Sequence, residues 1–211
     1  MKLSERVHDR YVQKRRADVL RDHLAELIPR DASALDVGCG DGLLAYRLME
    51  KRPDLKIRGI DVLVRETTFI PVEPFDGQTL PCGDAGVDVV MFIDVLHHTE
   101  DPMRLLREGA RAAGKAIVIK DHALEGVLAG ARLRFMDRVS NARYGVQLPY
   151  NYWPERRWFE ACDVLGLRVG AWRRDLRLYP RPFNFVFGGS LHFVARLDVA
   201  GGDQCSPGTS D

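Results

Sequence analysis

Residues 35–43 read Leu35-Asp36-Val37-Gly38-Cys39-Gly40-Asp41-Gly42-Leu43, and this stretch decides the fold of the chain. An apolar strand runs into an acidic residue, a turn with glycine at every second position follows, and residues 43–51 have the pattern of a helix. Glycine lacks a Cβ atom, so such a turn bends sharply and lets the backbone approach a ligand. The helix start offers unpaired N–H groups and the positive end of a dipole to an anionic group. The stretch therefore predicts a strand–turn–helix cradle for a nucleotide-type ligand.

The spacing of the glycines separates this turn from two other phosphate-binding turns. A dinucleotide fingerprint has a further glycine three residues after Gly40, where this chain has Leu43, and no Gly-Lys-Ser/Thr of a P-loop follows. The pattern resembles motif I of the class I S-adenosylmethionine (SAM)-dependent methyltransferases. That resemblance implies that Asp36 holds the turn and the methionine end of SAM, while Gly38 and Gly40 give the close approach.

The next strand carries a second cofactor signal. Residues 56–62 read as a buried strand that ends at the acidic Asp61. A carboxylate at the end of the second strand suits the two ribose hydroxyls of an adenosine, a geometry shared with dinucleotide sites. We therefore expect Asp61 and the adjoining Val62 at the cofactor.

Two further segments resemble the same family. Residues 74–93 are similar to its D-[AG]-x-x-L-P stretch and the strand after it, which implies Asp76 at the adenine amino group and Gly77 in a backbone contact beside the ring. Residues 94–102 resemble the V-L-H-H-x-x-D-P segment of the small-molecule branch, which includes the quinone-biosynthesis (type 11) methyltransferases, and place Asp94 at the cofactor.

The order of the elements predicts an α/β fold. Strands that alternate with helices form a parallel sheet with helices on both faces. The resemblance implies a Rossmann-like, doubly wound sheet of seven strands, mostly parallel with an antiparallel last strand. Strands are expected near 34–37, 57–61, 71–75, 87–93 and 115–120, helices near 41–51, 101–113 and 155–165, and a closing antiparallel hairpin over 167–179 and 191–197.

The chain is expected to form one methyltransferase domain over residues 31–197. Residues 1–30 hold a helix that covers the cofactor site, and Tyr11 on it either touches SAM or is only a packing residue. Residues 123–154 are expected to form a small substrate cap of one or two helices and a loop. Residues 198–211, rich in Gly, Ser and Asp, are expected to be a disordered tail.

Composition narrows the class of protein. With 211 residues, 45% of them hydrophobic and 29% charged, the chain has the composition of one soluble globular domain. No apolar run approaches the ~20 residues of a spanning helix, and the first residues lack the pattern of a secretion signal. The cysteines form no C-x-x-C pair and no disulfide framework. We therefore expect a reduced, cytoplasmic protein without a structural zinc site.

Residues 130–182 are expected to determine the acceptor. They hold eleven arginines, no lysine, five acidic residues and nine aromatic residues, in a chain of net charge +1. Guanidinium groups bind carboxylates and phosphates, and aromatic rings line apolar pockets. An acidic, aromatic or lipid-like small molecule, free or bound to a carrier, would suit this segment, as would an anionic membrane surface. One interpretation is that two or more of these arginines contact the acceptor or its carrier; the alternative, which applies to most of them, is that the arginines are a solvated face and the aromatics the core of the cap.

Candidate bases lie where the fourth and fifth strands end, because ligands bind outside the carboxyl ends of open α/β sheets. Histidine has an unperturbed pKa near 6.5 and so accepts a hydroxyl proton close to neutral pH. We expect His122 to be the general base with Asp121 orienting it, and His98 to be the second candidate. His97 is expected to be structural.

A metal site is the alternative interpretation of the same segments. One helical turn would put Asp94, His97 and His98 on a common face, next to Asp121 and His122 from the neighbouring strand. Carboxylates and imidazoles gathered in this way hold divalent ions that lower the pKa of a hydroxyl. Some quinone O-methyltransferases use a metal near the same strand ends, but with glutamates that this chain lacks. We therefore expect no metal.

Nucleic acid is a poor candidate for the acceptor. Residues 94–97 read Asp-Val-Leu-His, where amino-group methyltransferases have [DN]-P-P-[YFW], and the near-neutral charge gives no basic footprint. The sequence thus predicts methyl transfer from SAM, with S-adenosylhomocysteine (SAH) as product, to a small molecule, preferably at oxygen. A membrane-surface lipid or quinone methyltransferase and a non-catalytic SAM-binding partner protein remain alternatives, and the oligomeric state is not predicted.

Overall fold

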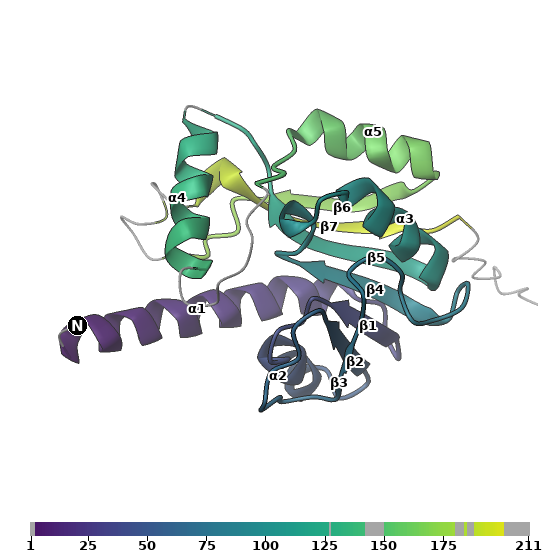
Figure 1. The fold of residues 1–211 in the computed structure, drawn as a ribbon, viewed down its shortest axis with the longest axis horizontal. Helices are drawn as coiled ribbons and strands as arrows, with labels where there is room; N and C mark the ends of the chain where they lie inside the picture. The colour runs from purple at the N-terminus through teal and green to yellow at the C-terminus, as the bar shows by residue number, and fades with distance from the viewer. Residues whose placement is uncertain (1–2, 127, 142–149, 180–183, 185–187, 201–211) are drawn as a thin grey trace, which may run out of the picture.

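The computed structural model describes residues 3–126, 128–141, 150–179, 184 and 188–200, with side chains from residue 15 onward except in 137–141. Seven strands form one sheet in the order β3-β2-β1-β4-β5-β7-β6 (Figure 1). β7 runs antiparallel to both of its neighbours, and the other described neighbours are parallel, as predicted. The strands are β1 (Ser33–Val37), β2 (Lys56–Asp61), β3 (Val72–Pro74), β4 (Val87–Ile93), β5 (Ala113–His122), β6 (Arg168–Arg174) and β7 (His192–Asp198).

Helices cover both faces of the sheet (Figure 1). α1 and α2 share one core with one face, and α3 and α5 share a second core with the other. α4 stands beside the sheet within the segment expected to be a cap, and two short 3₁₀ turns follow β4 and precede β7. The bounds are α1 (Leu3–Leu27), α2 (Leu43–Lys51), η1 (Leu96–His98), α3 (Pro102–Ala112), α4 (Ala129–Asn141), α5 (Glu155–Leu165) and η2 (Gly189–Leu191).

The two cores follow from the two-residue period of the strands. In β5, Ile117 and Ile119 pack in the α3/α5 core, while Val118 between them packs in the α1/α2 core. The same alternation continues to the end of the strand, so Lys120 and Asp121 belong to opposite faces. The end of β5 therefore places one charged residue on each face of the sheet.

The predicted elements are confirmed with two adjustments. β5 reaches His122, two residues beyond the predicted end, so Asp121 and His122 are strand residues. Asp198, assigned to the tail, is the last residue of β7, where it binds Arg196 at 2.6 Å and Arg168 at 2.7 Å; the remainder of the expected tail from residue 201 lies outside the described residues. No described helix combines the length and the apolar character needed to cross a bilayer.

Candidate cofactor and acceptor site

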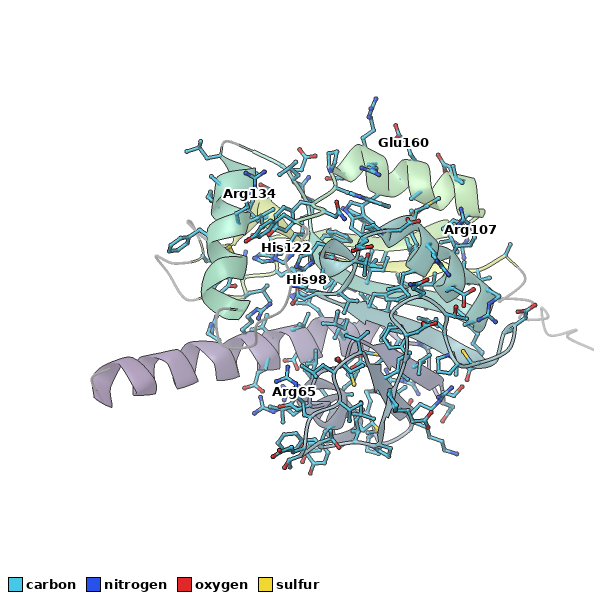
Figure 2. The ribbon with its side chains drawn as sticks, viewed as in Figure 1. Arg65, His98, Arg107, His122, Arg134 and Glu160 are labelled. Carbon is cyan, nitrogen blue, oxygen red and sulfur yellow. The ribbon has the colours of Figure 1, made fainter. Side chains whose placement is uncertain are left out.

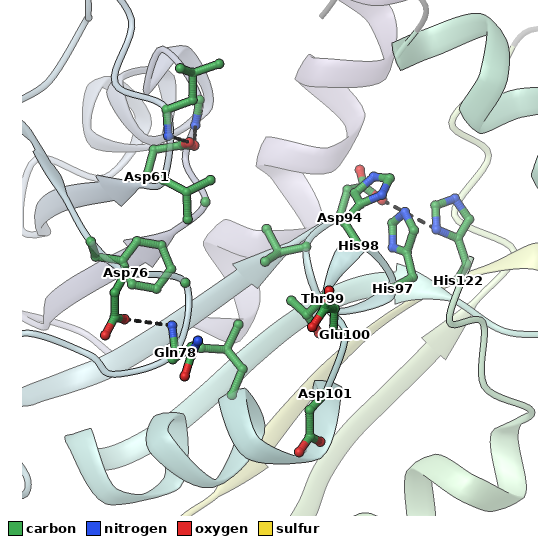
Figure 3. A pocket seen from close by; sticks show the side chains of 18 of the residues that line it. Asp61, Asp76, Gln78, Asp94, His97, His98, Thr99, Glu100, Asp101 and His122 are labelled. Atoms are coloured by element: carbon green, nitrogen blue, oxygen red, sulfur yellow. Dashed lines mark hydrogen bonds and ion pairs between the residues drawn. The ribbon is translucent and has the colours of Figure 1, made fainter. Parts of the chain in front are cut away.

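A cavity of about 700 Å³ opens where the parallel strands end. Figure 3 shows Asp61 and Asp76 at one end of it and the imidazole rings of His97, His98 and His122 at the other. Figure 2 places His98 and His122 between α4 and the sheet. Its wall includes Arg16, Gly38, Gly40, Asp61, Val62, Asp76, Gly77, Asp94, Val95, His97, His98, His122, Met136 and Tyr179.

The glycine turn forms a close-packed part of this wall. Gly38 has a φ of +69°, and a Cβ atom there would lie 2.6 Å from Cγ2 of Val95, so only glycine fits. The N–H of Gly40 donates to Asp61 Oδ2 at 2.8 Å, and the N–H of Leu63 donates to Asp61 Oδ1 at 2.8 Å. Asp61 therefore fastens the glycine turn to the end of β2, as well as facing the cavity.

Asp76 and Gly77 lie on the adjoining part of the wall, as the sequence predicted. The Asp76 carboxylate accepts the N–H groups of Gln78 and Thr79, both at 2.7 Å, and these bonds hold its pKa below the ordinary value. Gly77 has a φ of +77° and packs against Val62. The Asp76 carboxylate, a negatively charged hydrogen-bond acceptor, thus lies beside an apolar surface.

Asp36 differs from the other predicted cofactor residues because it does not belong to the cavity wall. It is 3% exposed, and its Oδ1 has no hydrogen-bond partner among the described residues. Burial, with a smaller contribution from the charge of Asp61, raises the pKa of Asp36 to about 7. Asp36 is therefore a buried carboxyl group at the end of β1 beside the turn, and its expected contact with SAM stays a prediction.

Three charged residues meet at the ends of β4 and β5. Asp94 has a φ of +57° and accepts hydrogen bonds from the fully buried Lys120 and from Arg16 Nη2, the latter at 2.7 Å. Burial alone would raise the pKa of Asp94, but the charges of Lys120 and Arg16 outweigh it and hold the pKa well below its usual range. Arg16 comes from α1, so this cluster joins the first helix to the cavity.

The histidine cluster places the Asp121 carboxylate nearer to His97 than to His122, its expected partner. Asp121 Oδ1 lies 2.5 Å from Nδ1 of His97 but 3.4 Å from Nδ1 of His122. The strand geometry explains the difference, because Asp121 and His122 are consecutive in β5 and point to opposite faces, while η1 carries His97 back over Asp121. Asp121 therefore orients His97, which sequence reasoning had taken as structural.

Burial lowers the pKa of His122, the predicted base. Loss of hydration lowers the pKa of His122 to about 4, and the charges of Lys120 and His97 act in the same direction. His122 is thus neutral at pH 7 and binds a proton poorly. His98, the second candidate, is on the cavity wall, whereas the side chain of Tyr11 lies outside the described residues.

The described arginines and most of the described aromatics of residues 130–182 follow the second interpretation, a solvated face and a core. The arginines of residues 130–182 whose side chains are described do not belong to the cavity wall; the arginines there are Arg16, Arg65 and Arg104. Trp153 and Trp158 are buried in the α3/α5 core, and Trp172 stacks on Phe193 at 4.1 Å between ring centroids. Core packing therefore explains these aromatics, and only Tyr179 of the described ones faces the cavity.

Metal-ligating groups also gather at this end of the cavity. His97, Asp121 and His122 offer ligand atoms that all lie within 4.8 Å of one another. Asp94 and His98, which the sequence added to such a site, are not in this group, and Asp94 is engaged with two cations. The described residues thus offer at most three ligands near a buried ammonium group, a poor environment for a divalent ion.

The chain matches a known protein family over more than half of its length. A model of the methyltransferase domain matches residues 8–169, which is more than half of the chain. The chain belongs to that family. With its seven-stranded sheet, it is a class I SAM-dependent methyltransferase by family and fold.

The chain matches only part of the length of each curated relative. A 27-O-demethylrifamycin SV methyltransferase of Amycolatopsis mediterranei is 32% identical over 107 residues, which is 44% of this chain and 39% of the relative. An uncharacterized methyltransferase of Mycobacterium tuberculosis is 43% identical over 74 residues, 32% of this chain and 38% of the relative. The chain thus matches about two fifths of the length of these curated relatives.

Solved structures share the fold at low sequence identity. A Haloferax volcanii methyltransferase, solved as a complex with the Trm112 activator, has a TM-score of 0.65 and 18% identity, covering 92% of this chain and 93% of that one. A Streptomyces coelicolor geranyl diphosphate C-methyltransferase, solved with Mg²⁺, geranyl diphosphate and SAH, has a TM-score of 0.63 and 13% identity, covering 86% and 77%.

We predict that Asp61→Ala lowers the affinity for SAM by about 10- to 100-fold, because the charged hydrogen bond that holds the glycine turn at Gly40 is lost together with the one from Leu63. Isothermal titration calorimetry measures this change. Glu73→Gln, an exposed substitution on β3 outside the cavity, is the matched control and should leave the affinity unchanged. Equal affinities of wild type and Asp61→Ala would remove Asp61 from the cofactor site.

We also predict that the ionisation of Asp36 lowers the free energy of unfolding as the pH rises. The folded chain keeps this proton up to about pH 7, whereas the unfolded chain loses it near 3.8, so the free energy of unfolding falls as pH rises between these values. Relative to Asp36→Asn, wild type should lose roughly 2–3 kcal/mol between pH 5 and pH 8 without added SAM. Urea unfolding at both pH values measures this. Parallel stability curves would show that Asp36 ionises normally.

Proposed function

We propose that this protein transfers the methyl group of SAM to a hydroxyl oxygen of a small molecule. One observation carries the proposal: a glycine turn with its carboxylate partner and a cluster of histidines with a carboxylate share the wall of one cavity. The first part is the cofactor cradle that the family implies, and the second supplies proton acceptors beside it. The cavity is large enough for a cofactor and part of an acceptor.

The residues of the wall fit SAM at each of its parts. Asp61 would accept the ribose hydroxyls, while Asp76 and Gly77 beside Val62 would hold the adenine ring. The methionine end of SAM carries an ammonium and a carboxylate, and Asp94 with Arg16 presents the complementary charges. When bound there, SAM supplies a methyl group activated by its sulfonium charge.

The acceptor end of the cavity would orient the acceptor and exclude water. Its wall combines the imidazoles of His97 and His122 with Met136 of α4 and Tyr179. Imidazoles that can take a proton favour a hydroxyl acceptor over a carbon. The name of the rifamycin-type relative, a methyltransferase of an O-demethyl compound, supports the same choice of oxygen.

The proposal is tested directly by incubating the protein with SAM labelled in its methyl group and a fractionated extract of the source cells, and by measuring which fraction takes up the label. We expect label in a small molecule and an equal amount of SAH. Label in precipitated nucleic acid or protein would contradict a small-molecule acceptor. SAM binding without SAH formation in any fraction would favour the non-catalytic alternative.

Arg16→Ala should lower SAM affinity by about 10- to 100-fold, because the methionine carboxylate would lose a charged hydrogen bond. Arg15→Ala, which removes an exposed arginine from the same helix, is the control and should bind SAM like wild type. Decarboxylated SAM sharpens the test. Its affinity should be the same for wild type and Arg16→Ala; an equal loss for both ligands would mean that Arg16 acts only on the fold.

A further inference from the structure

The chain between β4 and α3 forms part of both ends of the cavity wall. Its one regular element is the three-residue turn η1, and we call residues 95–101 the wall segment. At the cofactor cradle, Val95 of this segment packs against Gly38. At the other end of the cavity, the segment contributes His97 and His98 (Figure 3). A displacement of the wall segment would therefore change both ends of the cavity.

A turn of three residues satisfies few of its own backbone groups. Within it, the N–H of His98 donates to the carbonyl of Val95, and the N–H of Thr99 donates to the carbonyl of Leu96. The carbonyl groups at the end of such a turn have no helical partner. The carbonyl oxygens of residues 97, 99 and 100 therefore need donors from another part of the fold.

Asn151 supplies these donors. Its backbone N–H donates to the carbonyl of His97 at 3.1 Å, and its side-chain Nδ2 donates to the carbonyls of Thr99 at 2.7 Å and Glu100 at 3.3 Å. A carbonyl oxygen only accepts hydrogen bonds, so the Nδ2 side of the amide has to face these two groups. All three donors of one residue thus bind the wall segment.

The two sequence neighbours of Asn151 pack toward α4. Tyr150 and Tyr152 lie in a small third core together with Leu133 of α4. The ring of Tyr152 also stacks on the ring of His97, with 5.5 Å between the centroids. The short stretch 150–152 therefore connects α4, on one side, to the wall segment on the other.

The backbone at this connection has a conformation that a bulky residue rarely adopts. Tyr150 has a φ of +55°, in the left-handed region. Such a conformation persists where the surrounding contacts over-determine it, and it is common at ligand clamps and switch segments. The three hydrogen bonds of the adjacent Asn151 are contacts of this kind.

We propose that Asn151 is a positioning residue for methyl transfer, which couples α4 to the wall segment so that a ligand in the cofactor cradle also orders the acceptor end of the cavity. Asn151 does not belong to the cavity wall, so it acts through the wall segment. The segment meets the cradle at Val95, and α4 contributes Met136 to the wall. That the acceptor binds beside α4 rests on the function proposed above. Because such coupling is reciprocal, a bound acceptor would raise the affinity for SAM by the same factor.

Hydrogen exchange followed by mass spectrometry tests the coupling without an acceptor. The full chain is measured with and without saturating SAH. In wild type, SAH should slow exchange by about threefold or more both in residues 95–101 and in residues 129–136 of α4. Asn151→Asp keeps the size of the side chain but replaces both Nδ2 hydrogen bonds by a carboxylate that only accepts. In this variant SAH should still slow exchange in residues 95–101, whereas α4 should no longer respond.

Asn184→Asp is the matched control. The side-chain Oδ1 of Asn184 accepts the N–H of Tyr179 at 3.4 Å, and a carboxylate keeps this acceptor. Its α4 should respond to SAH as in wild type. An undiminished response of α4 in Asn151→Asp would overturn the proposal, and so would equal loss of the response in both variants. If circular dichroism shows that Asn151→Asp is unfolded, Asn151→Ser, which keeps one side-chain donor, takes its place with the same criteria.

Turnover separates positioning from folding and from cofactor binding. In the labelled-transfer assay, the rate of Asn151→Asp per molecule of bound SAM should be about 10- to 100-fold below that of wild type, because small displacements of reacting groups are costly. A variant that only unfolds more easily would keep the wild-type rate per bound SAM, and that result would overturn the proposal. If wild type forms no labelled product while α4 responds to SAH only through Asn151, the coupling stands and the proposed methyl transfer to a hydroxyl fails.

Discussion

The Asp94 carboxylate, shared by Lys120 and Arg16, holds this site together. Lys120 is fully buried at the end of β5, and an ammonium without a counter-charge in that position would cost several kcal/mol. Asp94 supplies the charge from the neighbouring strand, in a backbone conformation with positive φ. Because Arg16 binds the second oxygen, α1 is fixed against the same sheet edge. The cofactor cradle and the histidines are thus assembled around one ionic contact.

The parallel sheet explains why these groups meet. Parallel neighbours end at the same edge, so β4 and β5 deliver consecutive polar residues to one place. The alternation along β5 sends Lys120 toward α1 and Asp121 toward η1. β5 therefore places Lys120, which balances the charge of Asp94, and Asp121, which binds His97, on opposite faces of the sheet.

The fold and several residues of the cavity wall could be predicted from the sequence because those features are local. The glycine turn, the acid that ends β2 and the polar residues after β4 are each set within a few residues, and Gly38, Asp61, Asp76 and Asp94 all lie on the cavity wall. The pairing of Asp121 with His97 could not be read from adjacency, which favoured His122. Arg16 gave no sequence signal, since its partner lies 78 residues away.

The aromatic residues show a second limit of prediction from the sequence. Trp153, Trp158 and Trp172 suggested a substrate surface, but they fill the core between α5 and the sheet. Large rings serve packing and recognition equally well, and only tertiary contacts separate the two roles. Among the described side chains, the arginines of the cavity wall are Arg16, Arg65 and Arg104, which lie in three separate parts of the chain.

A crystal structure of the protein with SAH tests the central claim most directly. The account predicts the ribose on Asp61, the methionine carboxylate at Arg16, and the thioether sulfur directed toward the His97 ring, with space between them for an acceptor. SAH bound away from the glycine turn, or with its sulfur directed away from His97, would contradict it.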